Sequence, residues 1–196
     1  MFLVAGLGNP GEEYALSPHN LGFLTVDRLA ERYGIRITRK DSRALVGMGE
    51  IESCPVMLAK PQTFMNLSGT SLAPLMEKHA IPPDRLVLVH DELDLPWRAL
   101  RIKPKGSAAG HNGMKSVIAS LGTSDLARVR IGIHPGHPVR DGAEFVLAPI
   151  KRSQRKELEE LVDYAADAVR SIIAEGVAMA MTKFNRRAPG LTTEEA

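Results

Sequence analysis

Short apolar runs alternate with segments of helical periodicity along most of the chain. The runs are rich in Val, Ile and Leu, and they predict strands at Phe2–Leu7, Ala44–Ile51, Val56–Ala59, Leu86–His90, Ala99–Lys103 and Val129–Ile133. An alternation of this kind is typical of an α/β domain, in which helices cover both faces of a sheet.

Four segments have the apolar spacing of helices. They are Asn20–Tyr33, Asn66–His79, Asn112–Leu121 and the stretch from Ser153 to about Ala174. Gly34 is placed to end the first helix. Asn66 could cap the second, in which Pro74 predicts a kink or a late start.

Length and composition favour one ordinary globular domain. The 196 residues are 44% hydrophobic and 24% charged, with no internal repeat. We expect the domain to span residues 1–188 and a loose C-terminal tail to span 189–196.

The expected location is the cytoplasm, without membrane contact. No apolar run approaches the roughly 20 residues of a membrane helix, and the opening MFLVAGLG lacks a basic leader. The single cysteine, Cys54, allows no internal disulfide. Nothing in the sequence requires a dimer, so we expect a monomer. The net charge of +2 is too small to indicate nucleic-acid binding by itself.

The first strand is followed by a glycine motif that matches G-x-G-x-x-G at Gly6, Gly8 and Gly11. In dinucleotide-binding proteins the helix opens inside this motif, whereas here it is delayed to about Asn20. The acid expected about 20 residues on would be Asp27, which lies within the predicted helix. These mismatches argue against a nucleotide cofactor, although a nucleotide-dependent enzyme stays as an alternative.

Polar side chains gather where strands end. His19 and Asn20 open the first helix, Asp91 directly follows an apolar strand, and Asn66 and Asn112 stand at the starts of predicted helices. Each has an ordinary structural explanation as a cap or a turn residue. Together they predict a reaction site at one edge of the sheet.

The motifs GLGNPG, PHNLG, KPQTFMNLSG, HDELDLP, GHNG and RIGIHPG together resemble the bacterial-type peptidyl-tRNA hydrolase family. The resemblance runs from about Phe2 to Asn185. It implies a single three-layer α/β/α domain with a twisted mixed, mostly parallel sheet. It also implies hydrolysis of the ester that joins a peptide, or an N-blocked amino acid, to tRNA, without a cofactor or a metal.

The same resemblance assigns the site residues. His19 matches the general base, Asp91 the acid that orients it, and Asn9 completes the catalytic set. Asn66 and Asn112 match amides that hold substrate, and Tyr14 and Met65 match residues of the same pocket. The division of roles among the three amides stays open, and ordinary packing would also account for the last two residues.

The resemblance places the phosphate contacts for tRNA at Lys103 and Arg130. Four further basic residues could widen this surface or be an ordinary solvated face: Arg101, Lys105, Lys115 and Arg128. Lys183, Arg186 and Arg187 follow the last helical pattern, where basic side chains complement the helix dipole.

Several positions differ from the usual family pattern. Ser17 and Pro18 stand where Thr-Arg is common, and Lys105–Ala109 replaces much of a glycine-rich stretch. His134 and His137 lack a third ligand at a spacing typical of metal sites. No G-x-S-x-G serine motif is present. The alternative from another class is a relative that binds RNA without hydrolysing it.

Overall fold

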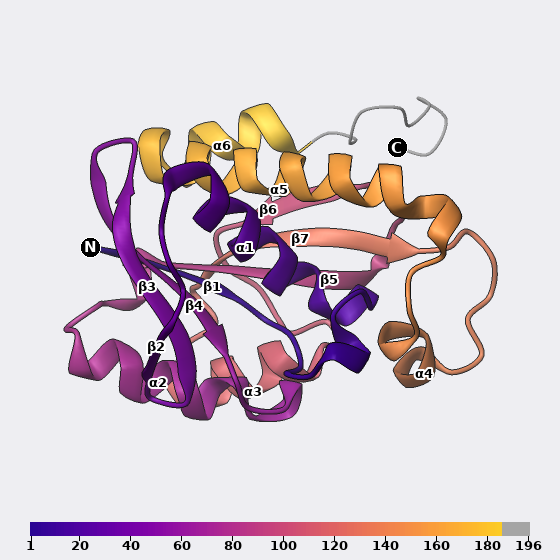
Figure 1. The fold of residues 1–196 in the computed structure, drawn as a ribbon, viewed down its shortest axis with the longest axis horizontal. Coiled ribbons are helices and arrows are strands. Elements are labelled where there is room, and N and C mark those ends of the chain that lie inside the picture. Colours follow the sequence, from indigo (N-terminus) through magenta and orange to yellow (C-terminus); the bar gives the residue numbers. More distant parts are fainter. Residues whose placement is uncertain (186–196) are drawn as a thin grey trace.

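The computed structural model describes residues 1–185 and contains one seven-stranded sheet with the strand order β2-β3-β4-β1-β5-β7-β6 (Figure 1). The strands are β1 Phe2–Gly6, β2 Arg39–Asp41, β3 Ala44–Ile51, β4 Cys54–Pro61, β5 Leu86–Pro96, β6 Leu100–Lys103 and β7 Ala127–His134. The helices are α1 Leu21–Tyr33, α2 Ser68–Lys78, α3 Asn112–Leu121, α4 Gly142–Leu147, α5 Arg155–Glu175 and α6 Val177–Phe184.

The sheet is mixed and mostly parallel, as expected. Strands β4, β1, β5 and β7 pair in parallel in the centre. The other strands pair antiparallel at the two sides, with β2 on β3, β3 on β4 and β6 on β7. The carboxyl ends of the four parallel strands therefore meet at one edge.

Helices cover the sheet on both faces and complete the three layers (Figure 1). In β1, Val4 packs with residues of α1 and α5, whereas Leu3 and Ala5 pack with residues of α2 and α3. This division follows from the alternation of side chains along a strand. Buried central strands have apolar side chains toward both layers, which is why they read as continuous apolar runs.

Most predicted elements lie within a few residues of their expected bounds, and three were missed. Strand β2 has only three residues, and α4 and α6 have six and eight. Strand β5 also continues past His90 because its pairing with β7 extends through the charged residues to Pro96. Short elements and charged strand ends give weak periodicity.

The second helix starts two residues later than the predicted segment, and the expected cap by Asn66 was wrong. Met65–Leu67 forms a 3-10 turn, α2 begins at Ser68, and its N-cap is Leu67 without a side-chain cap bond. Asn66 therefore does not cap this helix, and its side chain lies exposed in the turn.

The expected tail at 189–196 lies outside the described residues, as do Arg186 and Arg187. The boundary at residue 188 stays a prediction. Among residues 1–185, no helix combines the length and the apolar character that crossing a membrane requires.

Candidate active site

Two glycines bring the start of α1 against the sheet. A Cβ on Gly6 would lie 2.1 Å from the Gly22 carbonyl oxygen, and a Cβ on Gly22 would lie 2.3 Å from the carbonyl oxygen of Val89. Backbone therefore meets backbone where α1 crosses β1 and β5. This approach sets the preceding 3-10 turn Pro18–Asn20, with His19 at its centre, beside the end of β5.

Asp91 lies between two imidazoles at that end of β5. Its Oδ2 is 2.8 Å from His19 Nδ1, and its Oδ1 is 2.8 Å from His111 Nε2. The carboxylate is buried, with 1% of the residue exposed. Burial by itself would raise the pKa of Asp91, but the imidazoles of His111 and His19 outweigh it and hold that pKa well below its ordinary value. Asp91 is therefore an anion that accepts both hydrogen bonds.

The neighbouring contacts define the tautomers. The Met114 backbone N–H donates to His111 Nδ1 over 3.2 Å, so the proton of a neutral His111 is on Nε2 and is donated to Asp91. His19 donates its Nδ1 proton to the other carboxylate oxygen. A neutral His19 then has its lone pair on Nε2, which is the arrangement of a general base.

His90 is a third imidazole in this group, with its ring centroid 4.7 Å from that of His111. It is fully buried, and its Nδ1 donates to the Asp91 carbonyl over 2.7 Å. Burial, reinforced by His111, lowers the pKa of His90 to about 3. Its Nε2 has no hydrogen-bond partner within the described part of the chain. His90 is thus neutral near pH 7 and positions the backbone of Asp91.

Asn9 is held from three directions where β1 ends. Its backbone N–H donates to Asn20 Oδ1 over 2.8 Å, and Asn20 Nδ2 donates to its carbonyl over 2.9 Å. Its side-chain Oδ1 accepts the Met65 N–H over 2.8 Å. This bond fixes which atom of the Asn9 amide is the oxygen. The Asn9 NH₂ group has no protein acceptor among residues 1–185.

A cavity of about 270 Å³ opens beside these residues. His19, Asp91 and Asn112 line it, with Gly142, Ala143 and Val146 of α4 across from them. The structure thus brings three predicted site residues into one cavity. Asn9 and Met65 are not among its lining residues, although they bond each other and Asn20, the neighbour of His19, holds Asn9. Tyr14 and Asn66 lie in the partly exposed turns Glu12–Tyr14 and Met65–Leu67.

Sequence reasoning missed the role of His111, and it named Asn20 beside His19 without predicting that Asn20 anchors Asn9. His111 adjoins Asn112 in GHNG and bonds the same carboxylate as His19. Asn20 follows His19 in PHNLG and anchors Asn9. Both residues lie directly beside predicted site residues in the motifs GHNG and PHNLG. That adjacency was the sequence signal that could have identified their roles.

The side chains of His19, Asp91 and His111 also form the only group of three ligating residues found within the described range whose ligand atoms come close together, all within 4.8 Å of one another. Two imidazoles and a carboxylate can bind Zn²⁺. Here His111 would first have to give up the proton it donates to Asp91. His134 Nδ1 accepts the Gly136 N–H instead of joining such a group.

The expected phosphate contacts differ in exposure. Lys103 is exposed at the end of β6. Arg130 is mostly buried, with its Nη2 3.3 Å from Glu92 Oε2. The suggestion that Arg128 widens this surface was wrong, because it is buried and donates to the carbonyls of Leu126, Ser107 and Ser124. Its role is to tie the loop after β6 to the start of β7.

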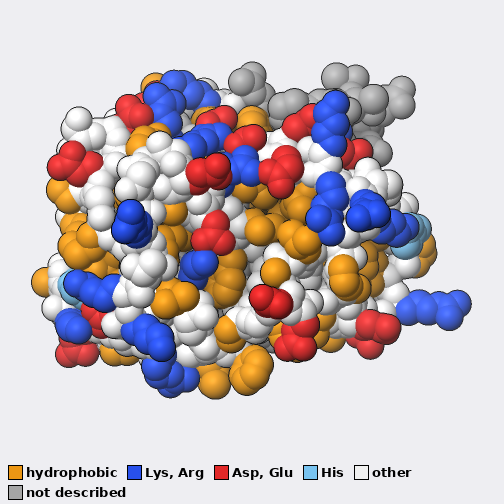
Figure 2. Space-filling view, in the orientation of Figure 1, with side chains coloured by type: hydrophobic (Ala, Val, Ile, Leu, Met, Phe, Trp, Pro, Cys, Tyr) orange, Lys and Arg blue, Asp and Glu red, His pale blue; other side chains and the backbone are white. Residues whose placement is uncertain are grey.

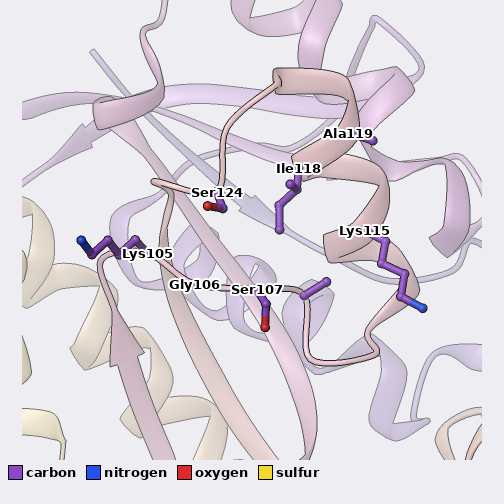
Figure 3. Close-up of a pocket in the computed structure, with 8 residues that line it drawn as sticks. Lys105, Gly106, Ser107, Lys115, Ile118, Ala119 and Ser124 are labelled. Atoms are coloured by element: carbon purple, nitrogen blue, oxygen red, sulfur yellow. The ribbon is translucent and has the colours of Figure 1, made fainter.

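The loop after β6 and one side of α3 enclose a hollow of about 770 Å³ (Figure 3). Lys105 borders it from the loop and Lys115 from the helix, and both side chains are exposed. The hollow lies beside the strand that ends at Lys103. By contrast, Lys183 pairs with Glu175, in agreement with a structural role near the helix end.

Comparison with known proteins identifies the family. Residues 3–191 match the family model described as peptidyl-tRNA hydrolase. The chain is 77% identical to the peptidyl-tRNA hydrolase of Solibacter usitatus over the full length of both, and 47% identical to that of Koribacter versatilis, covering 95% of this chain and 94% of the relative. The crystal structure of peptidyl-tRNA hydrolase from Acinetobacter baumannii superposes with a TM-score of 0.89 at 34% identity and 96% coverage of both chains. This chain belongs to the peptidyl-tRNA hydrolase family, the enzymes that cleave peptidyl-tRNA.

Proposed function

We propose that the chain hydrolyses the peptide–tRNA ester with His19 as general base and water as nucleophile. The observation that carries this proposal is the 2.8 Å contact between His19 Nδ1 and the buried Asp91 carboxylate. It holds the ring with Nε2 available, and the anion stabilises the imidazolium that forms when Nε2 takes a proton.

The reaction then has two proton transfers. His19 Nε2 removes a proton from water as the oxygen attacks the ester carbonyl, which gives a tetrahedral oxyanion. The intermediate expels the ribose oxygen of the tRNA, and that oxygen takes the proton back from His19. The products are a peptide acid and free tRNA, which returns to translation.

Amide donors complete the site in this proposal. The NH₂ group of Asn9 has no protein acceptor within the described residues, and Asn112 lines the cavity beside His19. Such groups can hold the substrate carbonyl or the oxyanion. Asn66 presents a third amide from the exposed turn, while Tyr14 and Met65 would provide an aromatic and an apolar wall.

The tRNA would lie along β6, β7 and the hollow beside α3. Lys103 supplies an exposed cation, and Arg130 can turn to phosphate by exchanging its Glu92 partner. Lys105 and Lys115 extend the positive surface across the hollow. Phosphate contacts of this kind position an RNA without reading its bases.

The test is release of an N-acetylated amino acid from tRNA by purified protein in the presence of a chelator. His19→Ala should abolish release while leaving the affinity for tRNA unchanged. Surviving activity would refute the assignment of His19. Equal loss of turnover and tRNA affinity would show that the residue serves binding or folding instead.

We also propose that the protein acts as a monomer in the cytoplasm. One chain supplies every residue of the mechanism above, so no second copy is needed to complete the site. Sedimentation velocity at working concentrations should show a single 21.3 kDa species. A dimer that persists on dilution would contradict the proposal.

A further inference from the structure

A second hollow, with two basic residues, lies at the same edge of the sheet as the catalytic residues but on the other side of β1. It has a volume of about 460 Å³. Its lining comes from the β2–β3 turn and the segment after β4: Lys40, Arg43, Ala44, Leu45, Gln62 and Thr63. Ala44 pairs with Pro61, so the turn and the end of β4 stand at one level.

The two basic side chains that line this hollow form no ion pair within the described part of the chain. Lys40 and Arg43 are exposed, and neither side chain has a hydrogen-bond or ion-pair partner among residues 1–185. Asp41 stands between them in sequence, but it accepts from His79 Nε2 over 2.9 Å and from Lys78 Nζ over 3.0 Å. Its charge is therefore engaged with the end of α2. Basic side chains gather in this region at the lower left of Figure 2.

The lining also contains an unsatisfied polar group. Thr63 has only 5% of its surface exposed, and its Oγ1 has no hydrogen-bond partner within the described residues. Burying a hydroxyl without a partner is costly, so such a group suggests a ligand or water in the complete system. Two residues further on, Met65 bonds Asn9. One short segment thus joins this hollow to the catalytic edge.

The strand order gives the substrate a direction across the sheet. The proposed tRNA contacts lie on β6 and β7, and the proposed base and its acid lie together at the end of β5. The ester is the junction of tRNA and peptide, so a peptide leading away from the tRNA passes toward β4 and β3. The hollow is located there, and β3 is three strand spacings from β5, which is roughly 14 Å.

We infer that Lys40 and Arg43 form a subsite for acidic side chains of the peptide part of the substrate. This inference rests on the proposed function, since it takes the direction of the substrate from the proposed tRNA contacts. An extended peptide covers roughly 14 Å in about four residues. The subsite therefore recognises carboxylates from about the fourth residue onward, counted from the ester.

The test uses a series of N-acetyl-hexapeptidyl-tRNAs that carry one Glu at position three, four, five or six from the ester, each matched by the same peptide with Gln. The wild type should show a KM roughly fivefold lower for the best Glu substrate than for its Gln partner, the upper end for exposed ion pairs. Lys40→Gln/Arg43→Gln should remove that preference. Arg155→Gln/Lys156→Gln, with the same charge change at the start of α5, should keep it.

Three results would overturn the subsite. One is the absence of any preference for Glu in the wild type. Another is a preference that survives in the Lys40→Gln/Arg43→Gln variant while its thermal unfolding matches wild type. The third is weaker binding of deacylated tRNA by that variant, which would assign the hollow to RNA. Hydrolysis of an N-acetyl-aminoacyl-tRNA, which is too short to reach the hollow, separates these outcomes from failure of the proposed function.

Discussion

Asn20 and Asn185 make the same pair of contacts at two separate places in the molecule. Asn20 accepts from the N–H of Asn9 and donates to its carbonyl, and Asn185 does the same to Ile102, at 2.6 Å and 2.9 Å. Only the first of these two backbone segments lies at the proposed site. Comparing Asn20 with Asn185 therefore distinguishes what this contact contributes to folding stability from what it contributes to catalysis.

Replacing either residue by Ala should cost about 2 kcal/mol of folding stability, because each change leaves a backbone donor and acceptor unpaired. Asn20→Ala should in addition lower kcat at least tenfold, since it releases the backbone that positions Asn9. Urea unfolding and single-turnover kinetics on both variants check this. Equal kcat values in the two variants would show that Asn20 does not position the site.

Asp91→Asn should lower kcat by about a thousandfold, by analogy with the loss of tautomer control in catalytic triads. An amide at this position cannot accept from both His19 and His111 with the same strength, and it does not stabilise an imidazolium. KM should stay near the wild-type value. A large rise in KM with little change in kcat would assign Asp91 to substrate binding instead.

The depressed pKa of His90 predicts a particular dependence of stability on pH. Unfolded His takes up a proton near pH 6.5, but folded His90 stays neutral down to about pH 3. The unfolded state therefore binds more protons between these values, and folding stability falls as the pH falls. The slope approaches about 1.4 kcal/mol per pH unit below pH 6.5.

The check is chemical denaturation from pH 7 to pH 4 with wild type and His90→Leu. The substitution removes the Nδ1 bond to the Asp91 carbonyl, so it should lower stability at pH 7. Its curve should nevertheless be flatter, because the titrating group is gone. Parallel curves for the two proteins would contradict the assignment. The low pKa of Asp91 adds to this trend only below about pH 4, because the stability that this carboxylate contributes is also lost as the pH falls from its unfolded pKa toward its folded pKa.

Chelators should leave turnover unchanged, because the proposed base needs only the Asp91 hydrogen bond. Added Zn²⁺ should inhibit, since it would compete with protons for His19, Asp91 and His111. The inhibition should weaken at lower pH and be reversed by the chelator. Loss of activity after metal removal, with recovery on adding a metal back, would require a different mechanism.

Lys103→Ala should affect tRNA binding, whereas Arg128→Ala should affect the stability of the fold. Removing the exposed Lys103 should weaken tRNA binding, reduce the salt dependence by about one unit of slope and leave stability unchanged. Removing Arg128 should destabilise the fold by about 3 kcal/mol, because three carbonyls lose their donor. Filter binding at several salt concentrations, together with thermal melting, distinguishes the two.

The sequence predicted the parts of the molecule with strong local signals. Apolar runs located the central strands, and the spacing within α1, α3 and α5 located those helices. It failed at α4 and β2, which are too short to show periodicity, and at Asn66, whose capping potential was overridden by a 3-10 turn. The burial of Arg128 and Arg130 could not be predicted either, because it depends on contacts with Ser107 and Glu92, which are 21 and 38 positions away.

The site was predicted as a set of residues, not as a geometry. Motif resemblance pointed to His19 and Asp91, which lie 72 positions apart and meet at 2.8 Å only because β5 and the start of α1 are adjacent. His111 reaches the same carboxylate from the N-cap position of α3, and its contact with a residue 20 positions away cannot be read from local sequence.

The contact of Gly6 with Gly22 has a consequence for engineering the enzyme. The spacing of the base from its carboxylate depends on two main chains that touch, not on the rotamer or volume of a core side chain. Heat-tolerant variants could therefore be sought by redesigning the apolar layer around Leu72, on the face of the sheet away from α1, with little disturbance of proton transfer. Even a single added methyl at Gly6 or Gly22 would push α1 outward and carry His19 away with it.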